Sequence, residues 1–276
     1  MRYSNQANLL GSISDQIVMR RIPFVILGFI IFYTGGIILG WCALPLVRLI
    51  TWNRIRGQQR CQHIVARGFS LLLWYLDLIK LYESGTLHME ELVPRKLETH
   101  SGTVLIANHP TLLDIVLIKS QLGHGTVVVK PLYYYNPLLG ILSWCCGYIR
   151  SGSSIGRGAV IIREAIERVN EGQTVIIFPE GTRSDPDKLL PFKRGAFMIA
   201  EQTQAPLASV MVKCTPRVLG RAQGFRGYPN RGSVKLFIFP FWGEKPEYLV
   251  QDARLSAREW EKKYRNELKK SHGSCL

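Results

Sequence analysis

Residues 103–114 read TVLIANHPTLLD, a short apolar run that leads directly into a polar segment able to start a helix. The run Thr103–Ala107 is rich in residues that favour buried strands. Pro110 suits the first position of a helix, because the N–H group that proline lacks would have no partner there. We therefore predict a strand that ends at Ala107 and a helix that continues through Leu113–Leu122.

Predicted strands and predicted helices alternate along the rest of the chain. Further strands are predicted at Thr126–Val129, Thr174–Phe178, Ser209–Lys213 and Ser233–Phe239, and further helices at Gly158–Asn170, Gly195–Thr203 and Ala253–Lys270. Strands that alternate with helices are typical of α/β proteins with a largely parallel sheet. We therefore expect a sheet of this type, covered by helices.

The composition supports a folded, basic protein. The chain has 276 residues, of which 47% are hydrophobic, and its 35 Lys and Arg against 20 Asp and Glu give a net charge of +15. These values exclude an intrinsically disordered, collagen-like or coiled-coil protein. A positive charge of this size favours anionic partners, such as anionic lipid head groups or an acidic protein.

The segment Ile22–Val47 contains no charged residue. About 20 apolar residues cross a bilayer, and the apolar part of a secretory signal is shorter, about 7–15 residues. We therefore expect this segment to bind a membrane. Gly35, Gly36 and Pro45 leave two arrangements open, a single span and a re-entrant hairpin.

A second helix is predicted at Ile64–Tyr82, either against the membrane or over the core. We expect residues 1–83 to form membrane-anchoring helices and residues 84–276 to form an α/β domain. More arginines follow the apolar segment than precede it, which predicts a cytoplasmic α/β domain. The six cysteines show no CxxC pair and are interpreted as reduced thiols.

His109 and Asp114 form the first candidate catalytic group. His109 stands at the junction between a predicted strand and a predicted helix, where sites in open α/β sheets are found. Its ring can fold back towards Asp114, since His109 precedes the helix. A carboxylate on one ring nitrogen fixes the tautomer and leaves the other nitrogen free as a general base. An ordinary structural contact between the two side chains is the alternative.

The segment FPEGTR, residues 178–183, follows another predicted strand. Glycine lets a backbone approach a ligand closely, arginine can bind a phosphate through two N–H groups, and threonine adds a hydroxyl. Other basic residues lie in the remaining loops, which predicts a site for an anionic ligand at the C-terminal edge of the sheet. The residues expected to contact this ligand are Lys130, Arg150, Glu180, Gly181, Thr182 and Arg183.

The motifs NHPTLLD at 108–114 and FPEGTRS at 178–184 together resemble those of the glycerolipid acyltransferases, the lysophosphatidic acid acyltransferase (1-acylglycerol-3-phosphate acyltransferase) family. The stretch from Lys130 to Arg150 is similar to the family's intermediate motif, and Ala205–Leu207 is similar to its fourth. The resemblance covers about residues 85–240. It implies an α/β fold with a mixed sheet flanked by helices, and an N-terminal membrane helix or helical hairpin.

The resemblance also implies an O-acyltransferase that uses no metal and no cofactor. His109 would remove the proton from the free hydroxyl of a lysolipid, with Asp114 orienting it, and the alkoxide would attack the thioester of acyl-CoA or acyl carrier protein. The segment Glu180–Arg183 would bind the glycerol phosphate of lysophosphatidic acid, with Lys130 and Arg150 assisting. The product would be phosphatidic acid, a phospholipid precursor, made at a membrane that we expect to be the bacterial inner membrane.

Other readings stay open. The segment PLASV, residues 206–210, lacks a second proline that is typical of the family, and Tyr133–Tyr135 is an unusual run. The acceptor could therefore be another lysophospholipid, glycerol-3-phosphate or a specialised lipid such as an aryl polyene lipid, and a phospholipid could be the acyl donor. A non-catalytic, basic membrane-binding protein is the alternative from another class. No nucleic-acid-binding module is recognisable, so no nucleic acid partner is expected.

Overall fold

The computed structural model describes residues 23, 26–78, 101–137, 139–152, 156–184, 189–215, 235–240 and 248–273. Within these residues, one seven-stranded sheet has the order β3-β2-β4-β1-β5-β6, with β7 paired to β5. The strands are β1 (Val104–Ala107), β2 (Thr126–Val129), β3 (Ile149–Arg150), β4 (Val175–Ile177), β5 (Pro206–Thr215), β6 (Lys235–Pro240) and β7 (Tyr248–Leu249). The neighbours from β3 to β5 are parallel, and β6 and β7 run antiparallel to β5. The predicted mixed, largely parallel sheet is confirmed.

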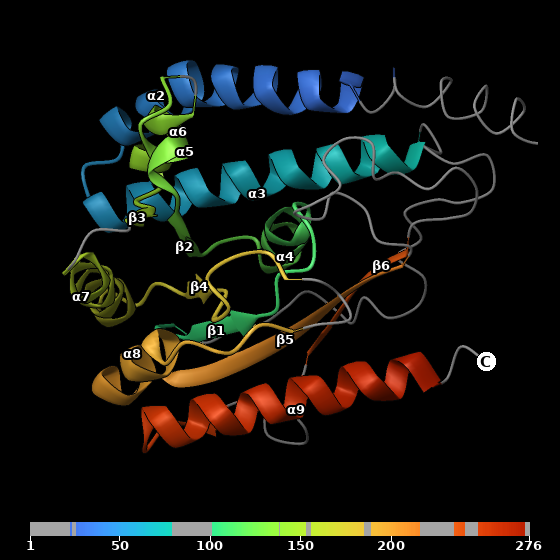
Figure 1. The fold of residues 1–276 in the computed structure, drawn as a ribbon. Helices are drawn as coiled ribbons and strands as arrows, with labels where there is room; N and C mark the ends of the chain where they lie inside the picture. The colour runs from blue at the N-terminus through green and yellow to red at the C-terminus, as the bar shows by residue number, and fades with distance from the viewer. Residues whose placement is uncertain are drawn as a thin grey trace, which may run out of the picture.

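Helices cover both faces of this sheet (Figure 1). They are η1 (Leu39–Ala43), α2 (Leu44–Ile50), α3 (Arg54–Leu78), α4 (Asp114–Leu122), α5 (Pro131–Tyr134), α6 (Gly140–Cys145), α7 (Arg157–Asn170), α8 (Gly195–Thr203) and α9 (Ala253–Gly273). Helices α3, α4 and α6 share one hydrophobic core with the sheet, and α7, α8 and α9 share another. The predicted helix at Gly195–Thr203 agrees with α8 to the residue.

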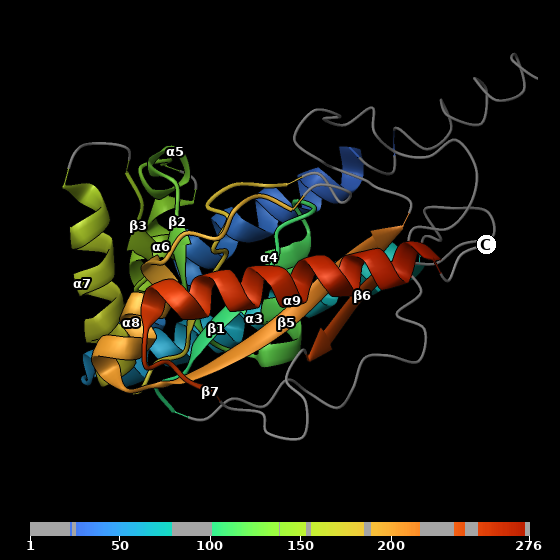
Figure 2. The same ribbon diagram turned by 60° about the horizontal axis from the view of Figure 1, so that its bottom comes forward.

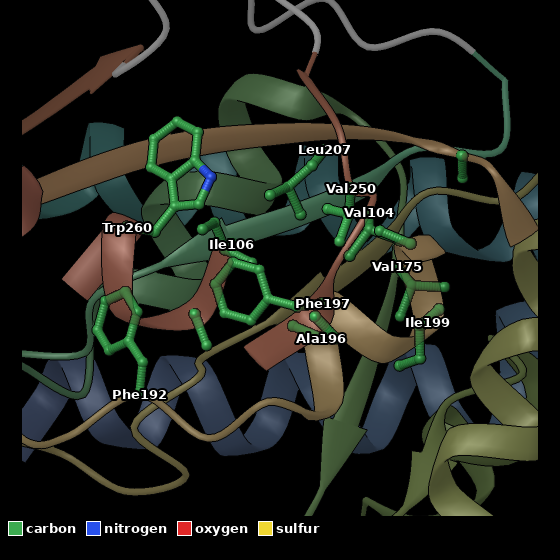
Figure 3. Packing of buried hydrophobic residues seen from close by; sticks show 14 of the residues in the cluster. Val104, Ile106, Val175, Phe192, Ala196, Phe197, Ile199, Leu207, Val250 and Trp260 are labelled. Atoms are coloured by element: carbon green, nitrogen blue, oxygen red, sulfur yellow. The ribbon is translucent and has the colours of Figure 1, made fainter. Parts of the chain in front are cut away.

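Strand β1 lies between the two cores. Leu105 and Ala107 point into the core under α3, whereas Val104 and Ile106 point into the core under α8 and α9. Figure 3 shows Phe197 of α8 beside Ile106. Because both faces of β1 are buried, its sequence is an unbroken apolar run, as parallel strands require.

One helix in the described part of the chain, Ile26–Ile50, is long and apolar enough to cross a membrane. It contains η1 and α2 and runs along α3 (Figure 1). The ring of Phe32 stacks on that of Phe69 with 6.3 Å between centroids. The helix continues past Gly35 and Gly36, so these glycines form no re-entrant hairpin within Ile26–Ile50.

Helix α3 begins at Arg54, ten residues before the predicted helix at Ile64. The sequence interpretation failed here because two polar side chains in the first turns of α3, Gln58 and Gln62, are buried, while the arginines of the same turns are exposed. Gln62 donates from Nε2 to the carbonyl oxygen of Cys146 at 2.9 Å and accepts at Oε1 from the Gly125 N–H at 3.0 Å. The predicted domain boundary after residue 83 lies outside the described residues, and the two-part division stays a prediction.

Lys119 of α4 is a fully buried cation. Its Nζ donates to the carbonyl oxygen of Gly125 and to the hydroxyl of Tyr148, each at 2.7 Å. Burial lowers the pKa of Lys119 from 10.5 to about 8, because the charged form loses its hydration. Lys119 therefore makes the stability of this core sensitive to alkaline pH.

The Lys119→Met variant tests this effect. Between pH 8 and 10.5 the unfolded chain keeps Lys119 charged while the folded chain holds it neutral. Because the unfolded state then binds more protons, rising pH adds to the stability of the wild type but not of the variant. We expect the wild-type free energy of unfolding, minus that of the variant, to increase across this window. Urea unfolding in detergent at several pH values measures it, and a difference independent of pH would contradict the assignment.

Candidate active site

Four parallel strands end at one edge of the sheet and carry the residues that the sequence singled out. His109 follows β1, and the segment Glu180–Arg183 follows β4. Lys130 directly follows β2, and Arg150 ends β3, where Val129 and Arg150 are register partners. The carboxyl ends of parallel strands share an edge, which is where ligands bind in open α/β sheets. The topology therefore brings all of these residues to that edge.

The side chains of His109 and Asp114 are in contact. His109 Nδ1 lies 2.7 Å from Asp114 Oδ2. The same carboxylate oxygen accepts from the Thr111 N–H at 2.8 Å, and Oδ1 accepts from the Thr111 hydroxyl at 2.5 Å. With three donors around it, Asp114 is fixed in position and can orient the imidazole.

Helix α4 starts at Asp114, so the prediction of Pro110 as a first helical residue is wrong. The segment from Pro110 to Leu113 instead turns around the Asp114 carboxylate. Thr111 makes this turn possible, since its N–H and its hydroxyl both donate to that carboxylate. The turn also brings His109 back to Asp114, which five residues of regular helix would not do.

The site leaves one nitrogen of His109 open. The His109 ring stacks on Phe178 with 4.2 Å between centroids, and its side chain is 20% exposed. Among the described residues, Nε2 has no hydrogen-bond partner. Asp114 is fully buried, and burial raises the pKa of its carboxyl, while hydrogen bonds from His109 and Thr111 lower it. The arrangement suits a base whose Nδ1 is held and whose Nε2 faces a ligand.

Glu180 links the two motifs through the backbone. Its side chain is only 2% exposed, with Oε1 accepting from the His109 N–H and Oε2 from the Leu190 N–H, both at 3.0 Å. Burial raises the pKa of the Glu180 carboxyl, and its hydrogen bonds oppose that shift. The sequence predicted that Glu180 contacts the ligand. The geometry favours a positioning role instead, since both oxygens are already used by the protein.

The rest of the FPEGTRS loop is folded against His109 and a second basic residue. The Ser184 N–H donates to the His109 carbonyl oxygen at 3.0 Å. Gly181 has φ +73°, a conformation that favours glycine, and Lys193 Nζ lies 2.6 Å from where a Cβ would stand. Thr182 and Arg183 are partly exposed on the same loop. This loop therefore offers backbone N–H groups, a hydroxyl and nearby cations to an anion.

Lys130 and Arg150 lie further along the edge. Lys130 is exposed and precedes α5 directly. Arg150 donates to the hydroxyl of Tyr135, and its guanidinium lies 5.1 Å from the centroid of the Tyr135 ring. Strand β4 separates β2 from β1 in the sheet, and neither cation contacts His109 among the described residues. They form the outer, basic part of the candidate site.

Sequence reasoning gave no role to several residues that hold the site. Thr111, Phe178 and Ser184 contact His109 or Asp114 directly. Asn108 pairs with β5, since Nδ2 donates to the Val212 carbonyl oxygen at 2.8 Å and Oδ1 accepts from the Val212 N–H at 2.7 Å. An asparagine directly after a strand was the available signal for that pairing, whereas the contacts of Ser184 depend on tertiary structure.

Comparisons with known proteins find similar sequences among acyltransferases. The family model described as Acyltransferase matches residues 86–213. A chloroplastic 1-acyl-sn-glycerol-3-phosphate acyltransferase of Brassica napus is 28% identical over 74% of this chain and 57% of its own length. The Limnanthes alba enzyme of the same name is 31% identical over 70% of this chain and 65% of its own length. The human beta enzyme is 31% identical over 52% of this chain and 52% of its own length. The chain thus spans less than two thirds of the length of these relatives.

A solved structure shows the same fold. The crystal structure of the 1-acyl-sn-glycerophosphate acyltransferase from Thermotoga maritima superposes with a TM-score of 0.60. The match covers 94% of this chain and 97% of that one at 22% identity. It therefore includes the N-terminal helices as well as the sheet, and it supports the architecture described above.

The Glu180→Gln variant tests the link between the motifs. An amide has one acceptor oxygen, so one of the two backbone N–H groups would lose its partner in the interior. We expect the free energy of unfolding to fall by about 1–3 kcal/mol. Glu164→Gln is the matched control, because its ion pair with Arg157 is partly exposed and worth about 0–1 kcal/mol. Equal losses in chemical denaturation of the two variants would contradict the role given to Glu180.

Proposed function

Because the chain belongs to the lysophosphatidic acid acyltransferase family of glycerolipid acyltransferases, we propose that it is a membrane-bound O-acyltransferase that converts lysophosphatidic acid to phosphatidic acid. The observation that carries the proposal is the contact between His109 Nδ1 and the buried Asp114 carboxylate, with Nε2 left open. This is the geometry of a general base aimed at an acceptor hydroxyl. The proposed acyl donor is a thioester, either acyl-CoA or acyl carrier protein.

The reaction follows from this geometry. His109 Nε2 takes the proton from the free hydroxyl of the lysolipid, and Asp114 stabilises the imidazolium that forms. The acceptor oxygen attacks the thioester carbonyl, a C–O bond forms, and the C–S bond then breaks. The proton on His109 passes to the departing thiolate, which returns the enzyme to its starting state. This route is supported by the fixed position of Asp114, which accepts three hydrogen bonds.

The proposed phosphate site is the loop after β4. Arg183 and the Gly181–Thr182 turn lie in the segment whose Glu180 and Ser184 bind the backbone of His109. An acceptor phosphate on this loop would place its glycerol hydroxyl beside the imidazole. Lys193 stands next to Gly181 and adds a cation. Lys130 and Arg150 are proposed to attract the anionic lipid from the outer part of the edge.

A large apolar surface supports binding to a membrane. Leu49 is 80% exposed at the end of the helix Ile26–Ile50, and the exposed Trp41 lies on the same helix. Leu132 of α5 and Trp144 of α6 are also exposed. Exposed apolar residues in this number favour contact with lipid. We propose that this surface enters the bacterial inner membrane from the cytoplasmic side, where the lysolipid is present.

The run Tyr133–Tyr135 bears on the choice of acceptor. Tyr135 accepts a hydrogen bond from Arg150, so part of the proposed basic edge is already paired within the protein. Because Arg150 is already bound to Tyr135, the acyl-transfer assay should include more than one acceptor. Glycerol-3-phosphate, other lysophospholipids and a specialised lipid such as an aryl polyene lipid are the alternatives with the same chemistry.

The first experiment measures acyl transfer in membranes that contain the full chain. Labelled acyl-CoA or acyl carrier protein is supplied with lysophosphatidic acid, and phosphatidic acid is quantified. We expect His109→Ala to lower kcat about 10²–10⁴-fold, since it removes the general base. His124→Ala is the matched control, because His124 lies at the opposite end of the sheet, before β2.

The outcomes of this assay distinguish the proposed activity from its alternatives. Product that is lost in His109→Ala and kept in His124→Ala supports the proposal. No product with either donor, from a folded protein, would rule out lysophosphatidic acid as the acceptor, and the other acceptors would be tested next. Equal rates in the wild type and in His109→Ala would remove His109 from the chemistry.

A further inference from the structure

Helix α9 carries a row of cations along one side. Successive residues of a helix are about 100° apart in projection. Relative to Arg258, Arg254 and Lys262 lie about 40° to either side, and Arg265 and Lys269 lie about 20° to either side. These five residues, here named the α9 stripe, extend for about 22 Å at 1.5 Å per residue. The acidic residues of α9 fall outside this row.

The charge of the α9 stripe is largely uncompensated. Arg254, Arg258, Lys262 and Lys269 are exposed. Arg265 pairs with Glu261 at 2.9 Å, while the other four cations form no ion pair with a carboxylate among the described residues. Solvated helix faces commonly carry i,i+4 pairs of opposite charge, as between Glu259 and Lys263 beside the stripe. A row of like charges costs stability by self-repulsion, so it points to an anionic partner.

The α9 stripe lies on the side of the molecule away from the apolar surface. Helix α9 covers one face of the sheet, and α3 with the helix Ile26–Ile50 covers the other (Figure 1). A membrane that takes up the apolar helix therefore lies across the sheet from the α9 stripe. This position disfavours a lipid surface as the partner and favours a soluble, acidic one.

The same helix is joined to the candidate active site. Figure 2 shows α9 lying along β5 and β1. The hydroxyl of Tyr264 donates to the Val210 carbonyl oxygen of β5 at 2.8 Å and lies 3.3 Å from that of Ile106 in β1. Glu261 accepts from the Phe192 N–H at 3.0 Å. Phe192 belongs to the segment in which Leu190 binds Glu180, the residue that holds His109.

We propose that the α9 stripe docks an acidic protein that carries the fatty acyl group as a thioester on a flexible arm. The proposal rests on the proposed function and specifies its acyl donor. The carrier would approach from the side away from the membrane, and its arm would reach the edge of the sheet while the lysolipid enters from the bilayer. We assign the α9 stripe to the protein-bound donor and not to a small nucleotide thioester, because the stripe lies on the exposed side of α9 and the candidate active site lies at the edge of the sheet.

The test compares two donors on one set of variants, with the full chain in membranes. The triple variant Arg258→Glu, Lys262→Glu, Lys269→Glu reverses three exposed charges of the α9 stripe. We expect kcat/KM with acyl carrier protein to fall about tenfold or more, since charge reversal removes electrostatic steering. The value with acyl-CoA should change less than about twofold. Arg163→Glu is the matched control for the single variant Lys262→Glu, because Arg163 is also an exposed cation but belongs to α7 and not to the α9 stripe.

Binding of the carrier protein without acyl transfer is measured beside activity, at low and high salt. Salt-sensitive binding to the wild type, lost in the triple variant, supports the proposal. Unchanged activity with the carrier, equal losses with both donors, or reduced binding of the triple variant to anionic vesicles would each overturn it. A wild type that uses acyl-CoA and binds no carrier overturns the docking proposal and leaves acyl transfer intact. A lack of product with both donors overturns the proposed function, and carrier binding then decides the docking proposal alone.

Discussion

The backbone of His109 is held on both sides by the loop after β4. Its N–H donates to Glu180, and its carbonyl oxygen accepts from the N–H of Ser184. These bonds join two segments that are about 70 residues apart in the sequence, and they fix where the imidazole can point. The motifs NHPTLLD and FPEGTRS therefore occur together for a physical reason. One supplies the ring and its carboxylate, and the other holds the backbone that carries the ring.

The parallel order of the strands makes this junction possible. Strands β1 and β4 are neighbours with Val104 opposite Val175, so the loops that follow them leave the sheet side by side. The Glu180 carboxylate then lies within reach of His109, and its burial is compensated by two backbone donors. Helix α9 extends the same hydrogen-bond network, because its Glu261 accepts from the Phe192 N–H. The site is thus supported by both the sheet and the C-terminal helix.

The sequence predicted the elements whose pattern is local. The apolar run Thr103–Ala107 and the helix Gly195–Thr203 are examples, because burial follows directly from residue type in each. It also predicted that His109 and Asp114 meet, but it placed the start of the helix at Pro110. The turn around Asp114 depends on hydrogen bonds from Thr111, which no periodicity reports. The contacts of Glu180 were not predicted for a similar reason, since its second partner, the Leu190 N–H, lies ten residues further along the chain.

We propose that His109 and Asp114 act as one catalytic unit. A double-mutant cycle on kcat/KM, with His109→Ala, Asp114→Ala and the combined variant, tests it most directly. Residues that act as a unit show strongly non-additive losses. We expect the combined variant to be about as slow as His109→Ala alone. Losses that add in free energy across the two sites would contradict it.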